Sequence, residues 1–170
     1  MTCKSGIGAL RDKDHNLVVE DKQKADLLNN FFASIGSLDD GNDVALDREV
    51  PDNVCLESVS FLPQVISRVI RKIKPKTSSG PDGFPPILVK KVASSITLPL
   101  SEIFRSFMSV GKIPDNWRHG IITPVYKSGI ASDPGNYRPI ALTSVFCKVM
   151  ERVISAEILQ YCKRHGLISD

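Results

Sequence analysis

Cysteine, histidine and uninterrupted hydrophobic sequence are scarce in this chain of 170 residues. The four cysteines, Cys3, Cys55, Cys147 and Cys162, include no Cys-x-x-Cys pair, so their spacing indicates neither a zinc site nor a disulfide framework. The three histidines are isolated and show no ligand spacing. No apolar run approaches the roughly 18 residues of a membrane-spanning helix, and the amino terminus begins no signal-peptide core. We therefore expect an intracellular protein, cytoplasmic or nuclear, with no membrane partner and with reduced thiols.

Acidic and basic residues are unevenly distributed along the chain. Residues 1–66 carry 6 Lys and Arg against 12 Asp and Glu, a net charge of −6, whereas residues 67–170 carry 16 against 7, a net charge of +9; the two add to the formal +3 of the chain. A basic field favours a polyanionic partner such as nucleic acid or a nucleotide. The alternative is a solvated basic surface without a partner.

The amino-terminal third predicts one helix and a linker. Ala25, Leu28, Phe32 and Ile35 recur at helical spacing between residues 21 and 35. The acidic sequence that follows is rich in Gly, Asp and Asn, which is typical of a flexible linker. We therefore expect a helical extension at residues 1–36, an acidic linker at 37–58 and a globular domain at 59–170.

The carboxy-terminal domain shows helical periods followed by two short β-prone runs and a final long helix. The expected elements are a helix capped by Ser60 and ended by Pro75, a loop over 76–83, a helix from Pro86, a helix through Leu100, Ile103, Phe104 and Phe107 up to Gly111, a hairpin of residues 121–127 and 137–142, and a helix from Phe146 that Gly166 ends. The expected fold class is α/β (α+β), rich in helix and with one β-hairpin.

The hairpin carries two cations beside its loop. Lys127 closes the first strand and Arg138 begins the second, where Pro139 keeps the preceding backbone extended. A lysine point charge and a planar arginine fork suit the phosphates of a nucleotide. The alternative is a pair of solvated cations on edge strands, since Pro124 and Pro139 cannot donate to a ladder.

Five segments together resemble a known family in their order and spacing: Gly80-Pro81-Asp82-Gly83-Phe84-Pro85, Ile113-Pro114-Asp115-Asn116-Trp117-Arg118, Ile122-Thr123-Pro124-Val125-Tyr126-Lys127, Asn136-Tyr137-Arg138-Pro139-Ile140-Ala141-Leu142-Thr143-Ser144 and Lys148-Val149-Met150-Glu151-Arg152. The set resembles the amino-terminal blocks of the reverse transcriptases, or RNA-directed DNA polymerases, of non-LTR retrotransposons. Residues 10–36 more loosely resemble the segment that joins the endonuclease of such elements to their polymerase. The resemblance implies the finger region of a nucleotidyltransferase.

The resemblance implies binding roles at two places. Arg138 matches the finger arginine that contacts the triphosphate of the incoming nucleotide, and Lys127 matches a basic residue of similar role. The loop of Ser79, Gly80, Pro81, Asp82 and Gly83 matches a block near the template strand. The implied partners are an RNA or DNA template-primer and a deoxynucleoside triphosphate. For Asp82 the alternative is turn formation, and for Trp117 it is hydrophobic packing.

The chain departs from the family where catalysis is concerned. Polymerisation uses two Mg²⁺ ions held by aspartates, and in the family these follow the finger region and the long helix. The Asp39-Asp40 pair precedes every motif and is interpreted as a solvated loop. We therefore expect a fragment without palm or thumb, without catalytic or metal-binding residues of its own, without activity alone, and with a tendency to self-associate through an uncovered palm-facing surface. The alternative is a non-catalytic nucleic-acid-binding or protein-interaction module derived from a retroelement.

Overall fold

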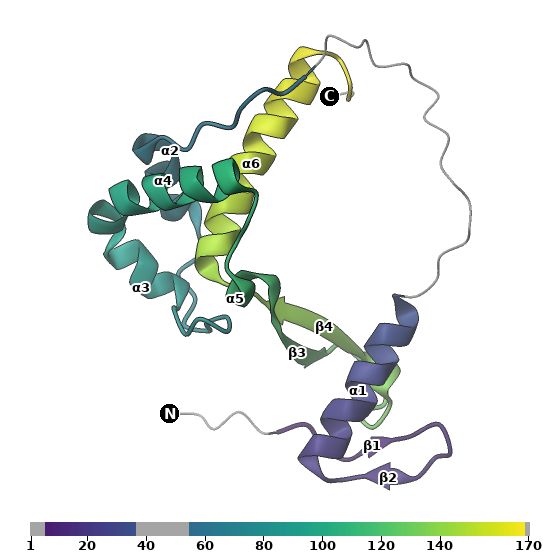
Figure 1. Ribbon diagram of the computed structural model, residues 1–170. Helices are drawn as coiled ribbons and strands as arrows, with labels where there is room; N and C mark the ends of the chain where they lie inside the picture. Colours follow the sequence, from purple (N-terminus) through teal and green to yellow (C-terminus); the bar gives the residue numbers. More distant parts are fainter. Residues whose placement is uncertain (1–5, 37–54, 169–170) are drawn as a thin grey trace. The chain divides into compact units, whose positions relative to one another are not determined.

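The structure is a computed structural model of the chain and describes residues 6–36 and 55–168 (Figure 1). Most of the predicted linker at 37–58, together with Cys3 and the Asp39-Asp40 pair, lies outside the described residues. The described chain divides into two compact units. One combines residues 6–36 with 122–141, and the other combines residues 55–121 with 142–168.

The first unit joins the amino-terminal segment to the β-hairpin that lies about a hundred residues later in the sequence. Its elements are β1 (Leu10–Arg11), β2 (Leu17–Val18), α1 (Asp21–Ile35), β3 (Ile121–Tyr126), the 3-10 turn η1 (Pro134–Asn136) and β4 (Tyr137–Leu142), with Ile121 and Leu142 assigned to the second unit. Leu10, Leu28 and Tyr137 form its buried core. The expected helix over 21–35 and the expected hairpin are therefore confirmed.

A second hairpin, β1–β2, was not expected. Leu10 pairs with Val18 and Arg11 with Leu17 in antiparallel register. The Asp12 carboxylate accepts hydrogen bonds from the backbone of Asn16 and Asp14 at 2.8 and 2.9 Å, and the bond from Asn16 lowers the pKa of Asp12. The prediction of only one hairpin was wrong, because strands of two residues are too short to show a period-2 pattern.

The buried face of α1 is narrower than its apolar spacing indicated. Leu28 is buried and Phe32 half-buried, but Ala25 and Ile35 are exposed. Lys24 is buried instead, since its ammonium donates to the Ile7 carbonyl oxygen at 2.7 Å and pairs with Asp21. The helix packs on a small core, so only its central turns are covered.

The second unit is built from helices around one core. Its elements are α2 (Pro63–Lys72), α3 (Pro86–Lys91), α4 (Ala93–Val110), α5 (Asp115–Arg118) and α6 (Val145–Arg164). The helix α2 packs against both α4 and α6. The core residues are Phe61, Ile66, Ile70, Ile73, Val89, Leu100, Phe104, Val145, Val149, Met150 and Val153. Most predicted helical stripes contribute to this core, whereas Ile103 is 42 % exposed.

The ends of the helices follow local sequence, with one exception. Ser144 caps α6 by accepting hydrogen bonds from the backbone N–H of Phe146 and Cys147. Gly111 ends α4, and Gly166 follows the end of α6; both adopt left-handed conformations. The predicted cap at Ser60 was wrong: α2 starts three residues later, at Pro63, where a residue without an N–H is well tolerated.

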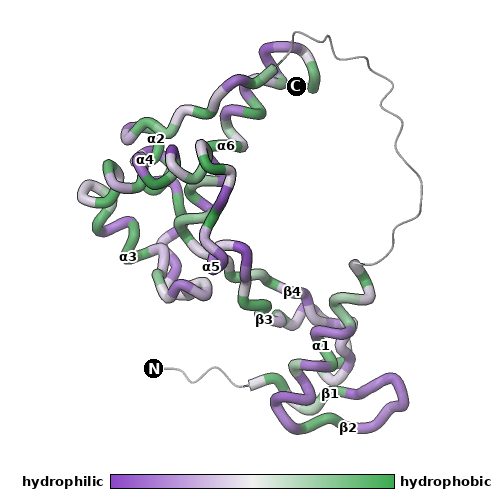
Figure 2. Tube along the Cα trace, in the orientation of Figure 1, coloured by the Kyte–Doolittle hydropathy of each residue, from purple (hydrophilic) through white to green (hydrophobic). Residues whose placement is uncertain are grey.

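Burial falls along α6 towards its carboxyl end. Val149 and Val153 are fully covered, whereas Ile158 and Leu159 are 44 % and 51 % exposed. Figure 2 shows hydrophobic and hydrophilic residues alternating along the helices of this unit. Of the described helices, none has the length and apolar character needed to cross a membrane.

Candidate nucleic-acid interface

The β3–β4 hairpin holds both predicted nucleotide-binding cations, and its register can be read from two contacts. The backbone N–H of Lys127 donates to the Asn136 carbonyl oxygen at 2.8 Å, and the rings of Tyr126 and Tyr137 lie 5.7 Å apart. Both contacts join residues that lie directly opposite each other in one antiparallel register. Continued along the strands, this register places Arg138 opposite Val125.

The same register assigns the side chains to two faces. Tyr126 and Tyr137 share one face, and Tyr137 is buried against Leu28 of α1. Lys127 and Arg138 are diagonal neighbours on the other face, because side chains alternate along a strand. Both cations are exposed, and neither forms an ion pair or side-chain hydrogen bond among the described residues. The hairpin therefore presents two unpaired cations on its outer face.

The register also accounts for the two prolines. Pro124 lies opposite Pro139, at a pair whose backbone N–H positions point away from the partner strand. Neither proline therefore removes a hydrogen bond from the ladder. Because the sheet has only these two strands, each strand has an unpaired edge, and each proline lies where it was expected to be tolerated.

The loop between the two strands is ordered by its own hydrogen bonds. The Tyr137 hydroxyl donates to the Ala131 carbonyl oxygen at 2.7 Å, and the Asn136 amide donates to that of Ile130 at 3.1 Å. The Arg11 backbone N–H donates to the Ser132 carbonyl oxygen at 2.7 Å, which connects the loop to β1. Lys127 and Arg138 thus flank a loop that is held at several points.

The predicted template-proximal loop, residues 79–83, lies in the other unit. Gly80 is buried in this loop: a Cβ built on it would lie 2.5 Å from the carbonyl carbon and oxygen of Thr143. Asp82 accepts a hydrogen bond from the Phe84 N–H at 3.2 Å, and the Gly83 N–H donates to the Gly80 carbonyl oxygen at 3.1 Å. The Asp82 Oδ2 atom is buried without a hydrogen-bond partner among the described residues. Asp82 therefore forms the turn, as the alternative interpretation expected.

Trp117 packs among aromatic side chains. Its ring lies edge-on to Phe104 and Phe107, with centroids 6.0 and 5.3 Å away. These contacts attach it to the core of the second unit. The packing interpretation of Trp117 is therefore confirmed.

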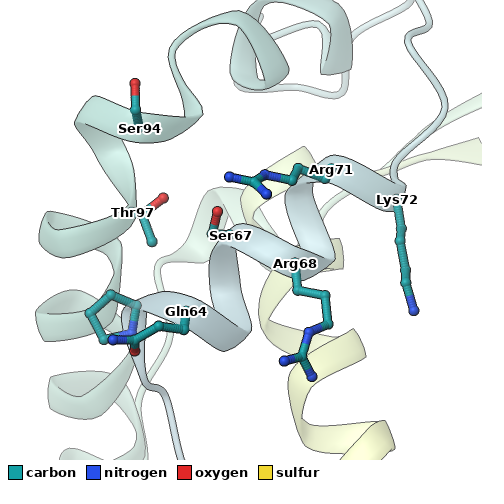
Figure 3. Close-up of a pocket in the computed structure, with 8 residues that line it drawn as sticks. Gln64, Ser67, Arg68, Arg71, Lys72, Ser94 and Thr97 are labelled. Carbon is teal, nitrogen blue, oxygen red and sulfur yellow. The ribbon is translucent and has the colours of Figure 1, made fainter.

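A basic groove between α2 and α4 was missed in the sequence. Its volume is about 590 Å³, and it is lined by Pro63, Gln64, Ser67, Arg68, Arg71, Lys72, Ser94 and Thr97. Figure 3 shows Arg71 and Ser67 on α2 facing the side of α4 that carries Ser94 and Thr97. The sequence does contain a signal for it, because residues 58–101 include seven Lys and Arg and one acidic residue, Asp82.

The described residues do not fit a catalytic metal. They contain no group of three His, Cys, Asp or Glu side chains that could hold a metal ion. The buried Cys147 thiol donates to the Glu151 carboxylate at 3.2 Å, and burial raises its pKa to about 12. A thiol in that state is neither a nucleophile nor a metal ligand at neutral pH.

Comparison with known proteins places this chain beside the polymerases of mobile elements. It is similar to RNA-directed DNA polymerases and Pol polyproteins of transposable elements, at 25 to 28 % identity over 63 to 75 % of its length. The resemblance to non-LTR retrotransposon reverse transcriptases drawn from the motifs is therefore confirmed. No family model matches the chain.

Three relatives illustrate the similarity. The retrovirus-related Pol polyprotein from type-1 retrotransposable element R1 of Bradysia coprophila is 28 % identical over 134 residues, which is 75 % of this chain. In Drosophila melanogaster, the RNA-directed DNA polymerase from mobile element jockey is 28 % identical over 116 residues (68 % of this chain) and the probable RNA-directed DNA polymerase from transposon X-element is 27 % identical over 108 residues (63 %). The matched regions cover only 12 to 13 % of the relatives' own lengths.

Proposed function

We propose that the chain forms the nucleotide- and template-binding finger region of a retroelement RNA-directed DNA polymerase. The observation that carries this proposal is the outer face of the β3–β4 hairpin, where the exposed Lys127 and Arg138 are diagonal neighbours without described partners. Similarity to the mobile-element polymerases supports it.

In this proposal the two cations bind the triphosphate of an incoming deoxynucleotide. The Arg138 guanidinium is a planar fork that can donate to two phosphate oxygens at once, and the Lys127 ammonium adds a mobile point charge. The buried contact of Tyr137 with Leu28 holds the hairpin while its other face stays open to solvent. The loop 79–83, which exposes Pro81 and Gly83, is the proposed template-side element.

We further propose that the 170-residue chain does not polymerise by itself. Phosphoryl transfer by a polymerase needs carboxylates that hold two Mg²⁺ ions, which polarise the phosphate and activate the primer hydroxyl. The similarity supports nucleotide and template binding by this segment, whereas the groups for metal binding would come from elsewhere in a complete enzyme. Magnesium-dependent primer extension by the purified chain would overturn this part.

Binding of a fluorescent deoxynucleoside triphosphate tests the hairpin. The double variant Lys127→Gln and Arg138→Gln is expected to weaken binding at least tenfold, since two charge-assisted phosphate contacts are lost. Lys13→Gln with Lys22→Gln is the charge-matched control, because both lysines are exposed in the same unit and lie off the hairpin. Equal losses of triphosphate affinity in the two double variants would show that binding depends only on overall charge, and they would contradict the proposal.

A second candidate is a protein-interaction module. The exposed Ile158 and Leu159 on the last turns of α6 favour it, because they leave an apolar surface without a described partner. We also propose that the chain self-associates through this surface.

A further inference from the structure

The groove between α2 and α4 is lined by three cations, Arg68, Arg71 and Lys72, and by no acidic residue. Residues 58–101 include the basic residues Arg68, Arg71, Lys72, Lys74, Lys76, Lys90 and Lys91 and the single acid Asp82, a net charge of +6. Exposed helix surfaces that are merely solvated commonly intersperse both signs, as α1 does with the exposed Asp21, Lys22 and Asp26. Three basic side chains in a groove whose lining holds no acid create a field that attracts a polyanion.

The groove combines that charge with free hydrogen-bond donors. Among the described residues, Arg68, Arg71 and Lys72 form no ion pair, and their side chains have no hydrogen-bond partner. Ser67 and Ser94 likewise have no described partner for their hydroxyls, whereas the hydroxyl of Thr97 donates to the Ala93 carbonyl oxygen. The site therefore holds two guanidinium groups, one ammonium and two hydroxyls that can all donate.

The arrangement of the donors favours a strand over a single anion. In Figure 3 the guanidinium of Arg71 extends into the space that α4 bounds, while Arg68 and Lys72 leave α2 on another side. One phosphate can be held by Arg71 and Ser67, and Arg68 and Lys72 then reach its neighbours along a backbone. An open groove of about 590 Å³ also suits a chain that passes through it.

The basic side chains are held by a supported helix. On its buried face α2 contributes Ile66 and Ile70 to the core. At its carboxyl end the Lys90 ammonium donates to the carbonyl oxygens of Arg71 and Ile73, both at 2.8 Å. The stems of Arg68 and Arg71 therefore start from a fixed backbone, which reduces the entropy lost when they bind.

We propose that the α2–α4 groove is a second polyanion site, which binds the phosphodiester backbone of a nucleic-acid strand independently of Lys127 and Arg138. It lies in the helical unit, whereas those two cations lie in the other unit. The proposal does not require the polymerase assignment, because it rests on the charge and donors of the groove. Recognition is through phosphate, so the site does not select a base sequence.

The test is binding of a fluorescent single-stranded RNA by the full chain, measured by anisotropy over a range of salt. The double variant Arg68→Gln and Arg71→Gln is expected to weaken binding roughly tenfold and to reduce the salt slope by about 1.4, at about 0.7 for each single-strand phosphate contact. Lys112→Gln with Arg152→Gln is the charge-matched control, since both are exposed in the same unit outside the groove. Circular dichroism and melting curves verify that all variants are folded.

Two further measurements distinguish a specific groove site from a diffuse electrostatic field, and a nucleic-acid strand from a single phosphate as the ligand. Arg71→Lys keeps the charge but removes the fork, so it is expected to weaken RNA binding about threefold to fivefold, whereas Arg152→Lys leaves it unchanged. Inorganic phosphate, compared with chloride at equal ionic strength, should compete only weakly with the RNA.

Equal losses of affinity in the groove and control variants would overturn the proposal in favour of a diffuse field. Strong competition by inorganic phosphate would show that the groove binds a single anion, and it would contradict a nucleic-acid strand as the ligand. Loss of triphosphate binding by the hairpin variant alone would leave this result untouched.

Discussion

Tyr126 and Tyr137 face each other across the β3–β4 hairpin, with ring centroids 5.7 Å apart and planes inclined by 61°. This pair decides which face of the hairpin meets α1, since Tyr137 is buried with Leu28. The opposite face is left to Lys127 and Arg138. One aromatic pair thereby orients two cations for which no contact of their own is seen among the described residues.

Gly80→Ala should destabilise the helical unit. The added Cβ would lie 2.5 Å from the Thr143 carbonyl group and 2.8 Å from the Ser144 nitrogen, both of them backbone atoms. Overpacking of this kind costs about 1–3 kcal/mol. Urea unfolding followed by the fluorescence of Trp117, which packs in the same unit, measures the loss. Gly8→Ala is the control, because no atom lies within 4 Å of the added group; a similar loss there would contradict the close approach.

Ser144→Ala should weaken the start of α6. The Ser144 hydroxyl is buried and accepts hydrogen bonds from two backbone N–H groups, at 3.2 and 3.4 Å. Loss of an N-cap costs about 1 kcal/mol. Thermal unfolding measures the change, and Ser155→Ala, an exposed position within the same helix, is the control that should stay within about 0.5 kcal/mol of the parent. A neutral Ser144→Ala variant would contradict the stabilising role of this cap.

Cys147 should make the folded state less stable in strong alkali. Burial, together with the hydrogen bond to Glu151, raises the pKa of its thiol from 9.0 to about 12, so the folded chain holds this proton more tightly than the unfolded chain. The resulting stabilisation is complete below pH 9.0 and is lost as the pH rises towards 12. The difference in unfolding free energy between the parent and Cys147→Ala should therefore shrink across this window.

A chemical probe checks the same thiol. Of the three cysteines in the described part of the chain, the exposed Cys55 should react first with a thiol reagent at neutral pH, Cys162 more slowly, and the buried Cys147 only on unfolding. Rapid labelling of Cys147 in the native chain would contradict the buried, protonated state.

Trp117 should affect stability and leave nucleic-acid binding unchanged. The ring contacts with Phe104 and Phe107 are lost in Trp117→Ala, which should cost about 2–4 kcal/mol for a half-buried aromatic, and less in Trp117→Phe. Because the chain has one tryptophan, its emission reports on the surroundings of Trp117 alone. Quenching of this emission when RNA is added to the folded parent would indicate that bases stack on the indole, and it would contradict a role in packing alone.

Self-association should depend on the exposed end of α6. Ile158→Glu with Leu159→Lys removes the apolar surface while adding no net charge, and it should shift a self-associating chain towards monomer in sedimentation velocity. The control is Leu98→Gln with Val110→Gln, which removes two exposed apolar side chains from α4. A parent chain that is monomeric at all concentrations would refute the expectation.

Much of the fold could be predicted from the sequence, because local signals there agree with tertiary packing. The bounds of α1, the start of α3 at Pro86 and the glycine at the end of α4 follow from periodicity and end residues. The β1–β2 hairpin and the start of α2 could not be predicted, since two-residue strands carry no periodicity and Ser60 competes with a later proline that suits a first turn.

The candidate site, too, could be predicted only in part from the sequence. The order of short motifs pointed to Lys127, Arg138 and the loop from Ser79 to Gly83, and the side-chain chemistry of Lys127 and Arg138 suits phosphate binding. Sequence alone determined the helical content, the class of relatives and the basic character of the carboxy-terminal part. Only tertiary structure decided that the hairpin packs with α1, which face carries the cations, and that α4 closes a groove beside Arg68 and Arg71. The reason is physical: periodicity and end residues act within a few turns, whereas the face a strand or helix buries depends on partners far away in the chain.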